Sequence, residues 1–160
     1  MPSLTFRSGQ IELRKFRVAS DTIIEVGDLI YIDNSNQAKP ASDFSWNTNL
    51  PTTQADFSAV FAGIAYSRSA DGDTNPVSVN VSPNSVYEAD ATSATFEVGT
   101  PLAPAEGSST LTTQQLETVA DPLNAIARAA EYHEQSSSRV RFTIASAFHT
   151  ASANINASLG

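Results

Sequence analysis

Hydrophobic and polar residues alternate along much of the chain with the two-residue period of β-strands. VSVNV (77–81) and RVRFTIA (139–145) each place apolar side chains at every second position, as half-buried strands do. LIYI (29–32) is apolar throughout, which is typical of a central strand covered on both faces. FAGIAYS (61–67) and SVYEA (85–89) are further candidates. The pattern predicts a mainly β fold.

The strand at 29–32 follows a Glu-Val-Gly step that occurs twice, in EVGDL (25–29) and EVGTPL (97–102). A glycine directly before an apolar run predicts a turn that uses the conformational freedom of glycine, followed by a strand. A phosphate-binding loop would need a glycine cluster that opens a helix, or a lysine close behind, and neither is present. We therefore expect two turns, with Asp28 as a hydrogen-bonding turn residue.

The chain also resembles itself at an offset of 62 residues. FAGIA (61–65) then falls on LNAIA (123–127), and VSVNV (77–81) falls on RVRFT (139–143). A Glu-Val-Gly step precedes both members of this repeat. The repeat predicts two related halves, and it favours a strand at 123–130 although the local residues prefer a helix.

Helical character is confined to residues 112–135. Thr112 and Gln115 form a capping-box pattern, so the sequence predicts one short helix near 113–120. The pair Asp121-Pro122 would suit the start of a second helix. That second helix is the alternative to a strand at 123–130.

Together these patterns predict a small barrel or sandwich of two related halves with one short helix. The expected organisation is an N-terminal arm at 1–17, a β domain at 18–148, and a flexible C-terminal tail at 149–160, whose residues are small and polar. The polar segment 34–56 predicts a long irregular loop. Its Trp46 is the only tryptophan and is a candidate contact residue, or else a cap over the edge of the core.

Composition and charge narrow the function. The 160 residues suit one domain, and a hydrophobic content of 41% is enough for a core. The absence of cysteine excludes disulfides, thiolate catalysis and Cys-ligated metals. No apolar run is long enough for a signal peptide or a membrane span, so we expect a soluble protein that is made in a cytoplasm and has no membrane partner.

The net charge of −8 is unevenly distributed. Four basic residues and one acid give the first 17 residues a net charge of +3, which leaves −11 for the remainder. An acidic body repels phosphate and disfavours nucleic-acid binding. A basic arm on an acidic body indicates a negatively charged neighbour, such as another copy of the protein.

No motif predicts catalysis or metal binding. DGDTN (71–75) begins like a calcium loop, but Pro76 stands where that loop needs glycine and Ser82 where it needs glutamate. We interpret this segment as a turn. His133 and His149 are 16 residues apart, and no nucleophile motif accompanies them. We therefore predict no enzyme activity, no cofactor and no metal site.

The succession of VGDLIYID, FAGIA, VSVNV, VYEAD, VGTPL and RVRFTI resembles the small bacteriophage capsid-cement, or head decoration, proteins over about residues 14–145. In that family a G-D-L-V-type step precedes a G-I-A-type strand and short valine-rich strands, and a second V-G-x-x-L step precedes the closing strand. The chain departs from this pattern at the longer segment 34–56, at 110–122, and beyond Phe148. These departures bear on surface contacts more than on the fold.

The resemblance implies a structural virion protein that is made in the host cytoplasm and binds the outer capsid surface. Such proteins are homo-oligomers, usually trimers, and they stabilise the shell by clamping neighbouring major capsid subunits. We expect the arm to carry this contact, because an extended segment can add a strand to a neighbour. The expected contact residues are the apolar anchors Phe6, Ile11, Leu13 and Phe16 and the charge partners Arg7, Arg14, Lys15 and Arg17.

Two other classes of function remain open. One is a carbohydrate-binding tail, spike or surface-layer module, with Trp46 and the segment 34–56 as its site. The other is an enzyme, which the lack of a converging nucleophile, base or metal set disfavours.

Overall fold

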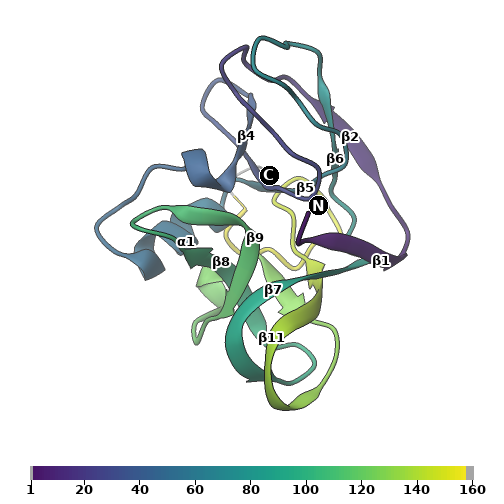
Figure 1. Cartoon of the computed structure of the whole chain (residues 1–160), viewed down its shortest axis with the longest axis vertical. Helices are drawn as coiled ribbons and strands as arrows, with labels where there is room; N and C mark the ends of the chain where they lie inside the picture. The colour runs from purple at the N-terminus through teal and green to yellow at the C-terminus, as the bar shows by residue number, and fades with distance from the viewer. Residues whose placement is uncertain (1, 158–160) are drawn as a thin grey trace.

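The structure, a computed structural model, describes residues 2–157, which form two related β units and a few helical turns (Figure 1). One sheet has the strand order β2 (Leu13–Phe16), β6 (Val77–Asn80), β5 (Phe61–Ala65), β3 (Leu29–Ile32) and β4 (Ala38–Pro40). The other has the order β1 (Thr5–Gly9), β7 (Ser85–Phe96), β11 (His133–Ile144), β10 (Ala127–Ala129), β8 (Pro101–Glu106) and β9 (Leu111–Thr118). The helical elements are α1 (Leu50–Ser58) and the 3₁₀ turns η1 (Ala41–Asp43) and η2 (Pro122–Asn124). The predicted mainly β class with one short α-helix is confirmed for the described residues.

The two halves share one topology. The order β2-β6-β5-β3-β4 of the first half matches the order β7-β11-β10-β8-β9 of the second, strand for strand. The second half closes into a five-stranded barrel because β7 also pairs in parallel with β9. In the first half, a parallel bridge between Arg17 and Gln37 brings the two ends of the sheet together in the same way. The prediction of two related halves is therefore right.

The Glu-Val-Gly step is a turn that starts β3 in one half and β8 in the other. In the first turn, the N–H of Asp28 donates to the C=O of Glu25 at 3.1 Å. In the second turn, the N–H of Thr100 donates to the C=O of Glu97 at 3.0 Å. The side chains of Asp28 and Thr100 also accept the N–H groups of Glu25 and Glu97, at 2.9 and 3.0 Å. The third residue is Gly27 with φ +95° or Gly99 with φ +93°, a conformation that favours glycine. The turn, and not a ligand loop, explains why the motif occurs twice.

The register of the repeat differs from the predicted offset of 62. Ala65 N–H donates to the C=O of Asp28, and Ala129 N–H donates to the C=O of Thr100, both at 2.9 Å. Ala65 therefore matches Ala129, an offset of 64. A register shift in the pairing of β3 with β5 is one reason, because an inserted residue breaks the letter-by-letter match.

Strand β3 is buried at every residue because it separates two hydrophobic clusters. Leu29 and Tyr31 pack into the main core, which the two halves share. Ile30 and Ile32 point the other way, into a second cluster inside the first half. This arrangement is what the unbroken apolar run LIYI predicts.

The helix predicted near 113–120 is wrong, because residues 113–118 lie in β9 and residues 119–120 follow it without forming a helix. Thr112 Oγ1 donates to the C=O of Ala105 at 3.0 Å and caps no helix. Strand β9 pairs with β8 on one side and with β7 on the other, so it closes the barrel. Leu111 and Leu116 are buried in the core. Tertiary pairing has overridden the local capping pattern.

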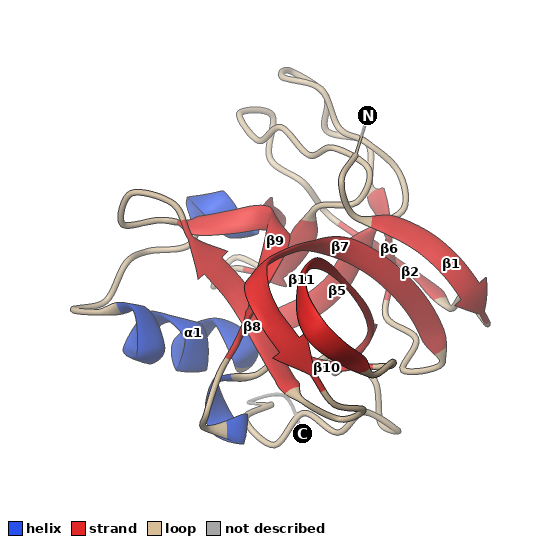
Figure 2. Cartoon of the chain, turned by 60° about the horizontal axis from the view of Figure 1, so that its bottom comes forward, coloured by secondary structure: helices blue, strands red, loops and turns tan. Residues whose placement is uncertain are grey.

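The predicted irregular loop at 34–56 is also wrong, since it contains β4, η1 and most of α1. The Asn49 side chain accepts the N–H of Thr52 at 2.9 Å and caps the helix, with Pro51 in the first turn. Gln54 holds α1 against the barrel by donating to the C=O of Pro104 at 2.9 Å. Figure 2 shows α1 outside the barrel beside β8.

The segment 123–130 is a strand only in part. Asp121 accepts the N–H of Leu123 at 3.0 Å and caps a single 3₁₀ turn, η2, as the Asp-Pro pair indicated. The chain then becomes extended in β10, which pairs with both β8 and β11. A second α-helix is therefore excluded here.

Within the described residues, the N-terminal and C-terminal segments both contact the rest of the fold. Strand β1 pairs with β7 and β2 pairs with β6, so no break separates the predicted arm at 1–17 from the domain at 18–148. We call residues 5–16 the outer ribbon. In the predicted tail at 149–160, Asn154 Nδ2 donates to the C=O of Ser58 at 2.7 Å. Residues 158–160 lie outside the described residues.

Buried Asn80 fastens the outer ribbon where it passes from one half to the other. Its Oδ1 accepts the N–H groups of Glu12 and Ser82, each at 3.1 Å. Its Nδ2 donates to Ser85 Oγ at 2.9 Å and to Tyr87 Oη at 2.6 Å. One amide therefore satisfies four polar groups of both halves in a site that water does not reach.

Candidate functional site

The outer ribbon forms one margin of the molecule, at the right of Figure 1. Its residues pair along one side with β6 and β7, in antiparallel register. Residues 5–16 therefore present their other side and most of their side chains to solvent. All eight residues predicted for the arm contact lie in the ribbon or, for Arg17, directly after it.

The four predicted apolar anchors differ in exposure. Phe6 and Leu13 are each 40% exposed. Phe6 lies edge-on to Tyr87, its cross-strand neighbour, with ring centroids 5.6 Å apart. Ile11 is half-buried, and Phe16 packs edge-on against Phe148 at 5.5 Å. Phe6 and Leu13 are thus available to a partner, whereas Phe16 serves the fold.

The four predicted charge partners are all exposed. Arg7 lies 3.8 Å from Glu88, and Arg14 lies 3.8 Å from Glu12. Arg17 donates to a backbone C=O in the hairpin between β3 and β4. Among the described residues, no ion pair involves Lys15. Exposed pairs of this length are weak, so these cations can exchange their partners at little cost.

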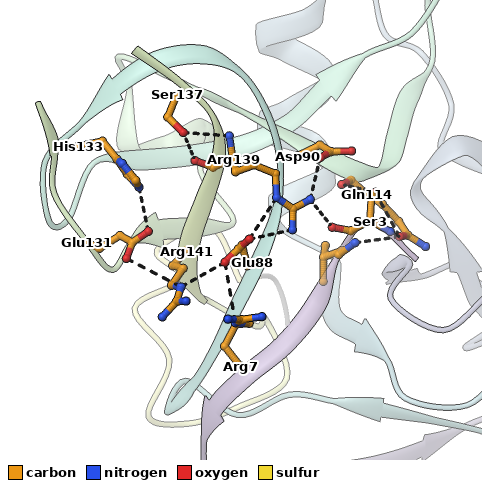
Figure 3. Close-up of polar contacts among 11 residues, drawn as sticks. Ser3, Arg7, Glu88, Asp90, Gln114, Glu131, His133, Ser137, Arg139 and Arg141 are labelled. Atoms are coloured by element: carbon orange, nitrogen blue, oxygen red, sulfur yellow. Dashed lines mark hydrogen bonds and ion pairs between the residues drawn. The ribbon is translucent and has the colours of Figure 1, made fainter. Parts of the chain in front are cut away.

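Beside the ribbon, a network of charges covers the outward side of β7 and β11 (Figure 3). Glu88 accepts from Arg139 Nη2 at 2.9 Å and from Arg141 Nε at 3.2 Å. Arg139 Nη1 also donates to Asp90 at 2.7 Å and to the C=O of Ser3 at 3.0 Å. The network joins three strands, β1, β7 and β11, and positions β1 against the barrel.

Hydrogen bonding from Arg139 lowers the pKa of Glu88. An acid whose pKa is lowered in the folded state contributes stability above its ordinary pKa, 4.5, and loses it as the pH falls through the lowered value. We therefore expect Glu88→Gln to lower the free energy of unfolding at pH 7 by about 1 kcal/mol. Urea unfolding at pH 7 and pH 3 measures the effect.

The matched control for that variant is Glu134→Gln, which removes an exposed carboxylate of β11. It should change the stability little at either pH. The free energies of unfolding of the wild type and of Glu88→Gln should become more similar when the pH falls below the ordinary pKa of the glutamate. An equal difference at both pH values would contradict the role assigned to the Glu88 carboxylate.

Trp46 is half-buried between η1 and α1. A shallow depression of about 300 Å³ lies in the same segment, with Tyr31, Asp33, Lys39 and Phe44 among its lining residues. Trp46 does not line it. Asp33 and Lys39 lie 3.5 Å apart and neutralise each other.

The two histidines each contact one carboxylate. His133 Nε2 lies 2.8 Å from Glu131 Oε1, at the start of β11. His149 Nε2 lies 2.8 Å from Glu12 Oε2 and ties the end of the chain to the outer ribbon. Within residues 2–157, no group of three His, Cys, Asp or Glu side chains could hold a metal ion.

The charge network around Glu88 was missed by sequence reasoning. Its signal is present, because VYEAD and RVRFTI place Glu88, Asp90, Arg139 and Arg141 at the polar positions of two alternating strands. Alternation predicts that these side chains share the outward direction. Alternation does not predict that β7 and β11 pair with each other, and this pairing brings the four charged side chains together.

In the part of the chain that the structure describes, no helix has the length and apolarity needed to cross a membrane. In comparisons with known proteins, neither a family model nor a curated protein matches this sequence, so its role has to be inferred from its own residues and geometry.

Proposed function

We propose that this is a structural virion protein, which binds the outside of a bacteriophage capsid and stabilises it by clamping neighbouring major capsid subunits. The residues that resemble the capsid-cement proteins support the proposal, because they are also the framework of this fold. VGDLIYID contains the turn and β3, FAGIA is β5, and RVRFTI is the closing part of β11. The role needs no catalysis and no cofactor.

The observation that carries the proposal is the surface of the outer ribbon. Exposed Phe6 and Leu13 lie there close in sequence to exposed Arg7, Arg14 and Lys15. The cations stand on a chain whose net charge is −8, so they form a local positive strip on an acidic protein. Such a strip favours a partner with an acidic surface, and we propose that this partner is the major capsid subunit.

Repeated attachment would make the binding durable. We propose a homo-oligomer, with a trimer favoured, on the outer capsid surface of the virion. Several ribbons then bind one shell at once, and the second and third contacts form at high effective concentration. Each contact can be modest while the assembly stays bound.

Co-sedimentation of the purified protein with undecorated capsid shells, across a salt series, tests the proposal. We expect saturable binding at a fixed number of copies per shell that weakens as salt rises. The double variant Arg14→Gln/Lys15→Gln should bind more weakly and depend less on salt. Arg68→Gln is the matched control, because it removes an exposed cation of the loop after β5.

Point variants are preferable to deletion of residues 2–17, because that deletion removes β1 and β2 from their sheets and would unfold the protein. If well-formed shells bind no wild-type protein, the proposal is overturned. Equal weakening in Arg68→Gln and in the double variant would instead place the contact away from the outer ribbon.

A further inference from the structure

The duplication shows which strand edges correspond in the two halves. The parallel bridge that closes the first half joins Arg17 to Gln37, and the one that closes the second joins Asp90 to Gln115. Arg17 therefore corresponds to Asp90, and β2 corresponds to the first part of β7. By the same offset of 73 residues, Lys15 corresponds to Glu88.

The outer edges of these two strands are used differently. In the second half, β1 lies antiparallel on the outer edge of β7 and pairs with residues 85–88. In the first half, β2 is the last strand of its sheet, and within the described residues no strand pairs with its outer edge over residues 13–16. Figure 1 shows β2 at the margin, with β6 on its inner side. The first half thus lacks the counterpart of β1.

The backbone of β2 is ready for a further strand. Glu12 C=O accepts from Val81 on the inner side, and Arg17 C=O accepts from Ala38 on the opposite side. Because successive residues of a strand alternate in direction, the N–H and C=O groups of Leu13 and Lys15 point to the open edge.

The outer edge of β1 is less suitable. A register shift interrupts β1 between Phe6 and Ser8, and irregularities of this kind blunt an edge. Strand β2 pairs with β6 at four consecutive residues without a shift. Of the two strands in the outer ribbon, β2 is therefore the one with a regular edge.

We propose that the outer edge of β2 accepts an antiparallel strand from the major capsid subunit, and that this strand is acidic. The inference rests on the proposed function and names the part of the surface that binds. Strand β1 shows the geometry: its Arg7 lies 3.8 Å from Glu88 of β7. In the first half Lys15 takes the place of Glu88, so the incoming strand carries Asp or Glu where β1 carries Arg7. Strand addition with this charge pairing gives both affinity and register.

Lys15→Pro tests the edge, because proline removes the N–H that faces the incoming strand and leaves the bonds to β6 in place. We expect it to bind undecorated capsid shells at least about tenfold more weakly than the wild type. Lys15→Gln is the control that removes the charge and keeps the N–H, and its loss should be smaller. Thermal unfolding of each variant verifies that the fold is intact.

Hydrogen exchange on the wild type gives a second readout that needs no variant. On shells, the amides of Leu13 and Lys15 should exchange at least about tenfold more slowly than in the free protein. If the wild type binds while Lys15→Pro binds equally well, or while these amides exchange unchanged, the strand acceptor is overturned and the proposed function survives. Shells that bind no wild-type protein overturn both.

Discussion

Replacing Gly63 by alanine should lower the free energy of unfolding by about 4 kcal/mol, since backbone strain and a forced clash each cost roughly 1–3 kcal/mol. Gly63 lies in β5 with φ +154°, and a Cβ atom there would be 2.0 Å from the backbone oxygen of Asn80. That oxygen belongs to β6, which cannot move without disturbing its pairing with β2 and β5. Urea denaturation of the two proteins measures the difference.

Gly72→Ala separates strain from the clash. Gly72 also has a positive φ, +89°, but a Cβ atom there meets nothing within 4 Å. We expect a loss of only about 1–2 kcal/mol for this variant, which is the cost of the backbone conformation. Similar losses in the two variants would show that β5 and β6 are farther apart than the structure has them.

Asn80→Ala should cost about 3 kcal/mol of stability, because it leaves buried polar groups without partners. The N–H groups of Glu12 and Ser82 lose their acceptor, and the hydroxyl of Tyr87 loses its donor. The site is fully buried, so water does not replace the amide. The midpoint of chemical denaturation reports the loss.

Ser82→Ala is the matched control for Asn80. The Ser82 hydroxyl accepts one N–H, from Asn84 at 3.0 Å, and Asn84 is exposed. Water can satisfy that group, so the loss should stay below about 1 kcal/mol. If Asn80→Ala cost no more than Ser82→Ala, the amide would not be the fastener of the outer ribbon.

The hydrophobic pattern predicted five strands, β3, β5, β6, β7 and β11, because a strand with a buried face leaves its pattern in the sequence. The unbroken run LIYI even indicated the position of β3 between two clusters. The Glu-Val-Gly turns could also be predicted from the sequence, because a turn position with a positive φ favours glycine.

The errors arose where distant pairing decides the structure. Thr112 and Gln115 fit a capping box as well as a strand, and only the pairing of β9 with both β7 and β8 selects the strand. The α-helix had a local signal in Asn49 and Pro51, but the polar segment around them concealed it. Charge asymmetry identified the residues of the outer ribbon, although not that they are strands of both sheets. Their role on a capsid stays a prediction.

The outer ribbon makes the folding of the two halves interdependent. Because residues 5–16 pair with both β6 and β7, the first half is stabilised by the second, and neither is a separate folding unit. The duplicated halves have therefore become interdependent and should melt as one cooperative body. A cut between them would leave two incomplete sheets with open edges, and such edges promote aggregation.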